Sequence, residues 1–244
     1  VYQRAVDRVS ELRANRADKP DAREWLNSLS SFQGRLRWHC HFIQKLESEP
    51  EIEFRNMNSC YNGLREDCFN RTYFEAWKSG RTGYPMIDAC MRFLTATGWL
   101  NFRMRALLIS FSSQHLWLHW REPSVHLAGL FTDYEPGIHY IQTQMQTGTT
   151  GINTIRIYNP IKQGLDQDPK GTFVRQWVPE LKDIEHDIIH TPWLSPNKPK
   201  GYPPPIVDEK TSRQTASKKL YAVRGKPEHK GIAREVYVKH GSRK

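Results

Sequence analysis

The interpretation of this sequence depends on one stretch: Trp77-Lys-Ser-Gly80-Arg-Thr82-Gly83-Tyr-Pro85-Met-Ile-Asp88-Ala-Cys-Met91-Arg92, followed by Thr97-Gly98-Trp99. A short helical pattern over residues 73–78 stops at Gly80. Pro85 begins the next helix, because proline suits the first helical turn, and Gly98 ends it. The stretch therefore predicts two helices joined by a short glycine-containing loop.

Apolar residues at spacings of three and four predict further helices on both sides of this stretch. These helices are expected over residues 3–16, from a cap at Asp21 to about residue 46, over 103–119 and over 172–181. Residues 133–138 and 147–151 are expected to be turns. Only residues 152–158 alternate as a strand does, and they are too isolated to form a sheet. We therefore expect one all-α, multi-helical domain over residues 1–194.

The composition changes after Pro192, where five further prolines between positions 196 and 205 disfavour a helix. Residues 195–244 contain 13 Lys and Arg and four acidic residues, so this segment carries +9 of the net charge of +10. We expect a Pro-rich and then basic extension that is irregular, apart from a turn or more of helix over 207–222, and mobile. Such a segment either adds salt-sensitive affinity for phosphates or is a solvated tail.

The 244-residue chain has no run of ~18 apolar residues and no signal peptide, so we expect an intracellular, cytoplasmic protein. Its four cysteines lack metal or disulfide spacing, so they are expected to be reduced, and no metal site is predicted. Phosphate-binding, dinucleotide-binding, metalloprotease and hydrolase motifs are absent. We also expect a monomer, and a fragment or processed chain because the first residue is Val1.

The motif W-x-x-G-x-T-G-x-P-x-x-D-A-x-M-R followed by T-G-W closely resembles the FAD-binding helical domain of the DNA photolyase/cryptochrome family. Supporting matches are Leu36-x-Trp38, Trp120-Arg121-Glu122, Arg156-Ile-Tyr-Asn159-Pro160, Arg175-x-Trp177-x-Pro179-Glu180-Leu181 and Tyr202-Pro-x-Pro-Ile206-Val207. The resemblance covers about residues 1–210. It implies a domain that holds FAD in a folded conformation, and a further N-terminal antenna domain of the same protein, which this sequence does not contain.

The resemblance also implies roles for residues around the flavin. Arg105 matches an arginine that pairs with an aspartate beside the flavin ring, and Asp133 matches that aspartate. Such a pair, buried in a medium of low dielectric constant, stabilises an anionic reduced ring. Tyr134 and Glu135 complete the segment that meets the ring and the ribose. His139 falls at the position facing flavin N5, where it is expected to supply a proton.

Three further residues are implied to contact the cofactor. Phe32 occupies the position of a flavin-proximal tryptophan, and His39 replaces an arginine near the phosphates. Phe102 lies at the boundary between flavin and DNA lesion, where relatives have Asn or His.

For DNA, the resemblance implies contacts from arginines to phosphates and from tryptophans to an extruded base. The residues implied to bind DNA are Arg35, Trp38, His41, Trp99, Arg103 and Arg156. Several positions depart from the pattern of dimer-repairing relatives. Arg35 replaces a carboxylate that binds the lesion, and residues 142–146 (Gln-Thr-Gln-Met-Gln) lack the tryptophan that stacks on it.

The electron relay of the family is also incomplete here. Relatives reduce FAD through three tryptophans, and Trp120 matches the middle one. No tryptophan lies between Trp120 and Trp177, so the flavin-proximal member is missing. Its substitutes are expected among Trp99, Trp117, Tyr134 and Tyr140.

Two functions follow from the resemblance. The first is light-driven repair, in which reduced FAD donates an electron to damaged pyrimidines in DNA. The second is a blue-light receptor without repair activity. The substitutions in the pocket favour the receptor, whereas Arg35, Arg103, Arg156 and the basic tail favour repair, which is the leading interpretation. A third possibility is an inactive fragment that binds FAD weakly.

Overall fold

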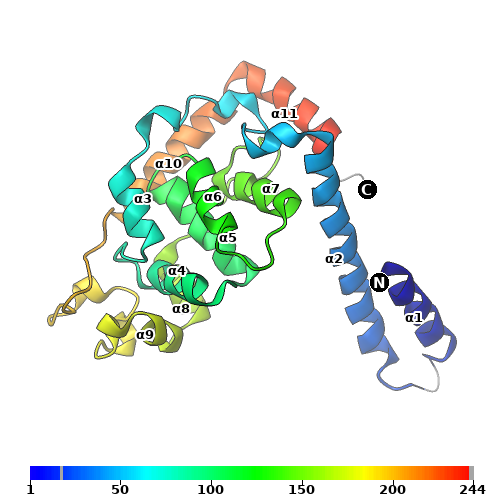
Figure 1. Ribbon diagram of the computed structural model, residues 1–244, viewed down its shortest axis with the longest axis horizontal. Coiled ribbons are helices and arrows are strands. Elements are labelled where there is room, and N and C mark those ends of the chain that lie inside the picture. Colours follow the sequence, from blue (N-terminus) through cyan, green and yellow to red (C-terminus); the bar gives the residue numbers. More distant parts are fainter. Residues whose placement is uncertain (17–18, 242–244) are drawn as a thin grey trace. The chain divides into compact units, whose positions relative to one another are not determined.

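The computed structural model describes residues 1–16 and 19–241, and every regular element within these ranges is helical (Figure 1). The all-α class expected from the sequence is confirmed. The chain divides into two compact units, Val1–Pro50 and Glu51–Lys244. None of the described helices is both long enough and apolar enough to cross a membrane.

The first unit is a pair of helices, α1 (Tyr2–Ala14) and α2 (Ala22–Ser48), packed on each other through small and aliphatic residues including Ala5 and Leu12. Both helices were expected. Asp21 does precede α2, but its side chain caps no backbone N–H there. It accepts a hydrogen bond from Trp25 Nε1 at 2.9 Å instead.

The second unit holds nine α-helices in its described part. They are α3 (Arg71–Lys78), α4 (Pro85–Thr97), α5 (Phe102–Ser110), α6 (Arg121–Ala128), α7 (Pro136–Thr147), α8 (Pro160–Gln167), α9 (Thr172–Trp177), α10 (Glu209–Arg224) and α11 (Pro227–His240). Three single turns precede α3: η2 (Pro50–Glu53), η3 (Ser59–Tyr61) and η4 (Glu66–Cys68). Others lie between the later helices: the π-helical η5 (Phe111–His115), η6 (Pro179–Leu181), η7 (His186–Ile188) and η8 (Pro192–Leu194). The main core lies between α4 and α5, where Ile87, Met91 and Leu107 are fully buried.

Two helices differ from the expectation. The helix expected over 103–119 ends at Ser110, and the chain continues as the π-helical turn. Residues 133–138 were expected to form a turn, but α7 begins within them at Pro136. Its first turn is capped by the Glu135 side chain, which accepts a hydrogen bond from the Gly137 N–H at 3.0 Å.

The C-terminal region is more ordered than the sequence indicates. Residues 195–208 are irregular, as expected, but α10 and α11 follow and pack on the second unit. Leu220 of α10 is fully buried beside Tyr61, and the Tyr61 hydroxyl lies 3.2 Å from His229 Nε2 of α11. Helix α10 falls where a turn or more of helix was expected, whereas α11 was not expected. The division of the chain at residue 194 stays a prediction.

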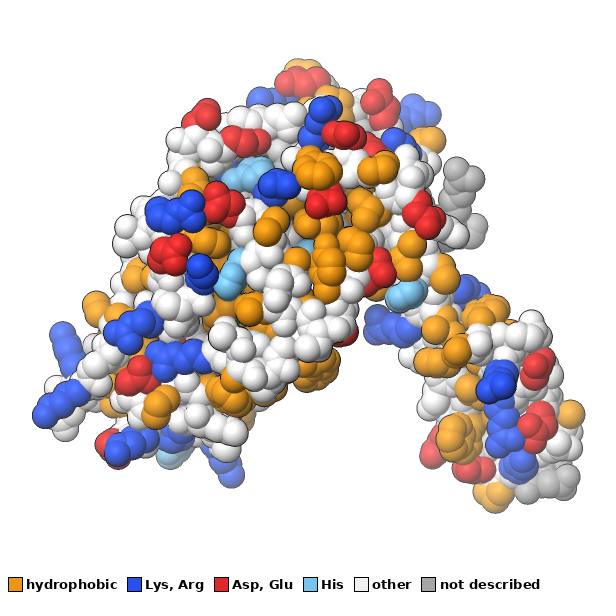
Figure 2. Space-filling model, in the orientation of Figure 1, with side chains coloured by type: hydrophobic (Ala, Val, Ile, Leu, Met, Phe, Trp, Pro, Cys, Tyr) orange, Lys and Arg blue, Asp and Glu red, His pale blue; other side chains and the backbone are white. Residues whose placement is uncertain are grey.

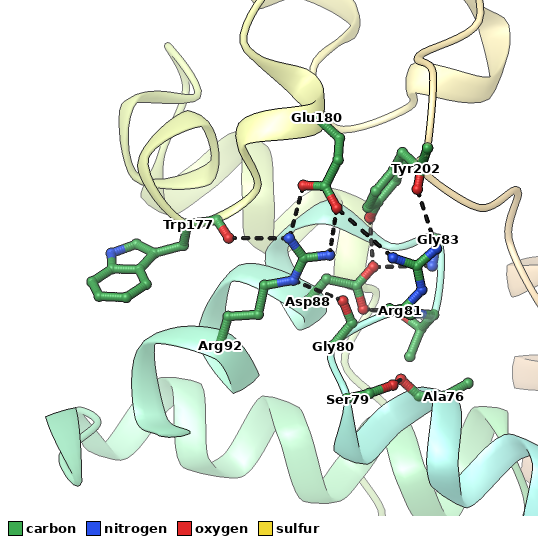
Figure 3. A network of polar contacts seen from close by, with 12 residues as sticks. Ala76, Ser79, Gly80, Arg81, Gly83, Asp88, Arg92, Trp177, Glu180 and Tyr202 are labelled. Atoms are coloured by element: carbon green, nitrogen blue, oxygen red, sulfur yellow. Dashed lines mark hydrogen bonds and ion pairs between the residues drawn. The ribbon is translucent and has the colours of Figure 1, made fainter. Parts of the chain in front are cut away.

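A buried carboxylate organises the loop before α4 (Figure 3). Asp88 is fully buried and accepts hydrogen bonds from four donors: the Thr82 N–H and hydroxyl, both at 2.7 Å, the Gly83 N–H at 3.0 Å and the Tyr202 hydroxyl at 2.6 Å. Gly83 has φ 78°, and a Cβ there would overlap the Pro204 backbone. The carboxylate thus holds together the loop, α4 and the segment around Tyr202.

Arg92, one turn further along α4, performs a similar task on the other side of the loop (Figure 3). Its guanidinium donates to both Glu180 carboxylate oxygens at 2.8 and 3.0 Å and to the Gly80 carbonyl at 3.0 Å. Two-point arginine–carboxylate contacts are strong and specific in direction. The signature motif around residues 77–92 is therefore a scaffold that fixes α4 relative to η6 and the Tyr202 segment.

We predict that Asp88→Asn lowers the free energy of unfolding by about 2–4 kcal/mol, because an amide nitrogen leaves at least one buried donor without an acceptor. Denaturant unfolding followed by circular dichroism measures the loss. Asp183→Asn, at an exposed carboxylate, is the matched control and should change stability by less than about 0.5 kcal/mol. Equal effects of the two substitutions would contradict this account of the loop.

Candidate cofactor site

A cavity of about 380 Å³ opens in the second unit between α5, α7 and the loop that joins α6 to α7. Its walls are mostly apolar, and hydrophobic side chains gather over the α7 region on the face shown in Figure 2. The lining residues are Trp99, Leu100, Asn101, Phe102, Arg105, Ala106, Ile109, Leu127, Phe131, Asp133, Tyr134, Glu135, Ile138, His139, Gln142, Thr143 and Gln146. The volume falls within the range of about 300–1,000 Å³ that is typical of small-molecule pockets.

The Thr97-Gly98-Trp99 segment that follows the signature motif positions the rim of this cavity. Gly98 ends α4 with φ 72°, and its carbonyl accepts hydrogen bonds from the Thr132 N–H at 2.9 Å and the Thr132 hydroxyl at 3.2 Å. A Cβ at Gly98 would clash with the Thr132 methyl group. The contact therefore brings the loop after α4 against the loop that carries Asp133.

Arg105 and Asp133 form the predicted pair across this rim. Arg105 Nη2 lies 2.9 Å from each Asp133 carboxylate oxygen, and Arg105 Nε donates to the Leu100 carbonyl. The guanidinium carbon stands 4.1 Å from the centre of the Phe131 ring, which adds a cation–π contact. Three contacts from two loops thus fix the direction in which the guanidinium points.

The pair is less buried than the sequence analysis expected. The Arg105 side chain is 26% exposed and the Asp133 side chain is 50% exposed. Asp133 lies on the loop before α7, at the mouth of the cavity, where few atoms of the second unit cover it. The expectation of a buried charge pair was therefore wrong, although the pairing itself is present.

His139 lies on the first turns of α7, where it lines the cavity among aromatic rings. Its ring centre is 5.4 Å from that of Tyr134 and 5.3 Å from that of Tyr140. Nε2 lies 2.8 Å from both the carbonyl oxygen and the hydroxyl of Ser124, so it donates to the carbonyl in one tautomer and accepts from the hydroxyl in the other. Burial lowers the pKa of His139 to about 4, and Arg105 acts in the same direction. The ring is therefore neutral near pH 7, which is at odds with the prediction that it supplies a proton.

One face of α7 supplies two polar residues, Gln142 and Gln146, to which the sequence analysis assigned no role in binding the cofactor. His139, Gln142 and Gln146 follow at spacings of three and four, so they share that face and line the cavity. The Gln142 Oε1 atom is buried and has no hydrogen-bond partner among the described residues. Gln142 and Gln146 could have been found in the sequence from their spacing of three and seven residues after His139, if α7 had been predicted as a helix.

Gln144, on the opposite side of α7, fixes the helix to the start of the second unit. Its amide nitrogen donates to the Ile52 and Arg55 carbonyls, both at 2.8 Å, and its oxygen accepts from the Met57 N–H at 2.8 Å. These contacts determine the rotation of α7 about its axis. They therefore determine which side chains face the cavity.

The other predicted site residues of the second unit lie in several places. Phe102, Tyr134 and Glu135, predicted to bind the cofactor, and Trp99, predicted to bind DNA, all line the cavity. Arg103 and Arg156 are exposed. Trp120 is fully buried and does not line the cavity; its Nε1 donates to Asn56 Oδ1 at 2.8 Å.

The remaining predicted residues lie on α2, in the first unit. Phe32, Arg35 and His39 are exposed, and their spacing places them on one face of that helix. Trp38 is also exposed, and its ring contacts that of His41 at 5.5 Å. Their roles toward FAD and DNA stay predictions.

The family model for the FAD-binding domain of DNA photolyase matches residues 32–222. The chain therefore belongs to the DNA photolyase family, as the resemblance implied, and the cofactor of this domain is FAD.

Relatives of known name agree with this assignment. The deoxyribodipyrimidine photo-lyase of Streptomyces griseus is 35% identical over 182 residues, which are 73% of this chain and 39% of that protein. Cryptochrome-2 of Arabidopsis thaliana is 36% identical over 162 residues, 62% of this chain and 26% of that protein. The archaeal photolyase of Sulfolobus tokodaii, solved with two FAD molecules, matches with a TM-score of 0.75 and 33% identity, over 83% of this chain and 46% of that chain. The chain thus spans less than half the length of these relatives.

The residues of the cavity fit a flavin ring. Apolar side chains such as Leu100 and Ile109 suit the flat faces of an aromatic ring system, and the unpartnered Gln142 oxygen offers an acceptor to a ring N–H. Arg105 and Asp133 would hold the polar edge of the ring. Among the described residues, no group of three His, Cys, Asp or Glu side chains is arranged to hold a metal ion.

We predict that the burial of His139 makes stability fall as the pH is lowered from about 6.5 to about 4. In this window the unfolded chain binds a proton at His139 that the folded chain does not, so acid favours unfolding. His139→Gln should remove up to about 3 kcal/mol of this loss. Denaturant unfolding at several pH values measures it.

His186→Gln, at an exposed histidine, is the control for this prediction and should leave the pH dependence as it is in the unmodified chain. An unchanged pH dependence in the His139→Gln variant would show that the ring is not held neutral by burial.

Proposed function

We propose that this chain is the FAD-binding part of a light-driven DNA repair enzyme that acts on damaged pyrimidines. Bound in the cavity in its reduced form, the flavin would supply the electron for repair. The observation that carries the proposal is the cavity itself, where an oriented Arg105–Asp133 pair and an unpartnered Gln142 oxygen border apolar walls. The family membership of the chain supports the same function.

The DNA side of the proposal rests on exposed groups near the cavity. Trp99 is half-exposed and lines the cavity, and Arg103 is exposed on the first turn of α5. An exposed indole suits stacking on an unpaired base, and an arginine suits a phosphate. We propose that these residues receive a base turned out of the duplex.

Electrons must also reach the flavin, and the structure supports a tyrosine at the position nearest the cavity. Tyr134 lines the cavity, and its ring centre is 6.5 Å from that of Tyr140. The Tyr140 hydroxyl donates to Glu53 Oε1 at 3.2 Å. When FAD is bound, Tyr140 would serve as an electron donor toward it, and Glu53 would accept the phenolic proton of Tyr140. A thiol in solution would then reduce the oxidised Tyr140. Trp120 remains the proposed tryptophan of the relay.

Trp117 is a poor candidate for the same relay. Arg65 lies 4.2 Å and Lys219 lies 4.5 Å from the centre of its ring. Removing an electron leaves a positive charge on the indole, and two cations at these distances oppose it. The relay is therefore proposed to bypass Trp117.

A blue-light receptor is the second candidate function, and one observation favours it. The α7 face of the cavity presents Gln142, Thr143 and Gln146, and it offers no indole to stack on a pyrimidine dimer. A receptor needs the flavin and the electron relay but not the stacking ring.

Repair is tested with the full chain loaded with FAD, reduced and illuminated with blue light in the presence of oligonucleotides that carry pyrimidine dimers. We expect restored bases, scored by chromatography, and none in the dark. Asp133→Asn should weaken FAD binding about tenfold, because Arg105 loses its charged partner. Asp166→Asn, at a surface ion pair, is the control and should bind FAD as the unmodified chain does.

A chain that binds FAD and is reduced by light but restores no bases would favour the receptor. A chain that binds no FAD would overturn both candidate functions.

For the relay, we predict that Tyr140→Phe and Glu53→Gln each slow light-driven reduction of bound FAD several-fold, because electron loss from a phenol requires a proton acceptor. Flash absorption spectroscopy measures the rate. Trp117→Phe is the control and should leave it unchanged. If Trp117→Phe slowed the reaction and Tyr140→Phe did not, the proposed route would be wrong.

A further inference from the structure

A second hollow, of about 470 Å³, lies on the second unit between α11, the end of α10 and the loop at Gly151–Ile152. It is separate from the cofactor cavity and shares no lining residue with it. The lining residues are Gly151, Ile152, Arg224, His229, Lys230, Ala233, Arg234 and Tyr237.

The hollow is strongly basic. Lys230 and Arg234 are exposed and four residues apart, so they project from the same face of α11. Arg224 is held at its edge by a hydrogen bond to the Asn153 carbonyl at 3.0 Å. The acidic residues of α11, Glu228 and Glu235, are not among the residues that line it. Three cations therefore converge without an acidic neighbour in the lining, which is a setting that attracts phosphates.

Exposed aromatic rings accompany the cations. Tyr237, in the lining, is 59% exposed. A neighbouring hollow along α10 repeats the combination, with Arg213, Lys218 and the half-exposed Tyr221. Cations that follow a sugar–phosphate backbone, together with rings on which bases stack, are typical of surfaces that bind single strands.

Both hollows are lined by residues of α10 and of the segment 151–157, although no residue lines both, and we treat them together as the α10–α11 surface. Arg156 is exposed on that shared segment. Helix α11 lies beyond residue 222, where the family match ends. The part of the surface that holds Arg224, Lys230, Arg234 and Tyr237 therefore lies outside the family match, whereas residues 151–157 and most of α10 lie within it.

We propose that the α10–α11 surface binds single-stranded DNA, with Arg224, Lys230 and Arg234 on backbone phosphates and Tyr237 and Tyr221 stacked on bases. The strand is bound whether or not it is damaged. Helix α11 is preformed for this task, since Val236 and His229 are buried against the unit. The inference stands apart from the repair proposal, because it needs neither flavin nor light.

The test is the affinity of the full chain for fluorescently labelled oligo(dT) in the dark, measured by anisotropy over a range of salt concentrations. Lys230→Gln/Arg234→Gln removes two exposed cations and keeps Arg224, which bonds to the main chain. We expect about tenfold weaker binding at 0.1 M salt and a salt slope smaller by about 1.4, that is about 0.7 for each lost phosphate contact. Tyr237→Ser should weaken binding further, and Tyr237→Phe should not.

The matched control is Lys170→Gln/Lys182→Gln, which makes the same change in charge at exposed lysines near α9, at the other end of this unit in Figure 1. An equal loss of affinity in both double variants would show that the effect depends on net charge alone, and it would overturn the proposal. Binding of duplex DNA as tight as that of oligo(dT), with no effect of Tyr237→Ser, would also overturn it, because the bases would then take no part. Truncation is a poor substitute for these variants, since α10 carries the buried Leu220.

Discussion

The buried carboxylate of Asp88 is the constraint on which the rest of the second unit depends. Burial raises its pKa, and hydrogen bonds from Tyr202 and Thr82 oppose that rise. Such a group is tolerated in a core only when its oxygens are fully paired, so the loop at residues 80–84 has little freedom. Because the loop is fixed, the direction of α4 is fixed, and α4 leads directly to the rim of the cofactor cavity.

The geometry of the cavity depends on the position of α4. The Gly98 carbonyl ties the end of α4 to the Thr132 loop, and the same loop delivers Asp133 to Arg105. Gln144 anchors α7 from its far side and so turns Gln142 inward. The signature motif thus acts mainly at a distance: residues 77–92 line none of the cavity, yet they set the positions of those that do.

A large part of this structure could be predicted from the sequence, because the residues that end and begin the helices act through their own backbone conformations. Pro85, Gly80 and Gly98 are residues with narrow backbone preferences, so helix boundaries around them could be assigned directly. The Arg105–Asp133 pair was predicted through the family resemblance. The partial exposure of this pair was not predicted. Exposure depends on how other parts of the fold cover the α6–α7 loop, and a local sequence pattern carries no information about that.

The failures share a physical cause. Helix α7 contains the polar run Gln-Thr-Gln-Met-Gln, which lacks the apolar periodicity that indicates a helix, and it is held by tertiary contacts of Gln144. Helix α11 buries two histidines, His229 and His240, and a single aliphatic residue, Val236, so its sequence lacks the apolar pattern of a packed helix and predicts a solvated basic tail. In both cases long-range packing outweighs local propensity.

The central claim is that flavin binds between α5 and α7, against the loop that carries Asp133. Hydrogen exchange of the full chain with and without FAD, resolved to peptides by mass spectrometry, tests it most directly. The account predicts slower exchange in residues 129–146 when FAD is added and no change in α8 and α9. Bound FAD that leaves the exchange of residues 129–146 unaltered would contradict it.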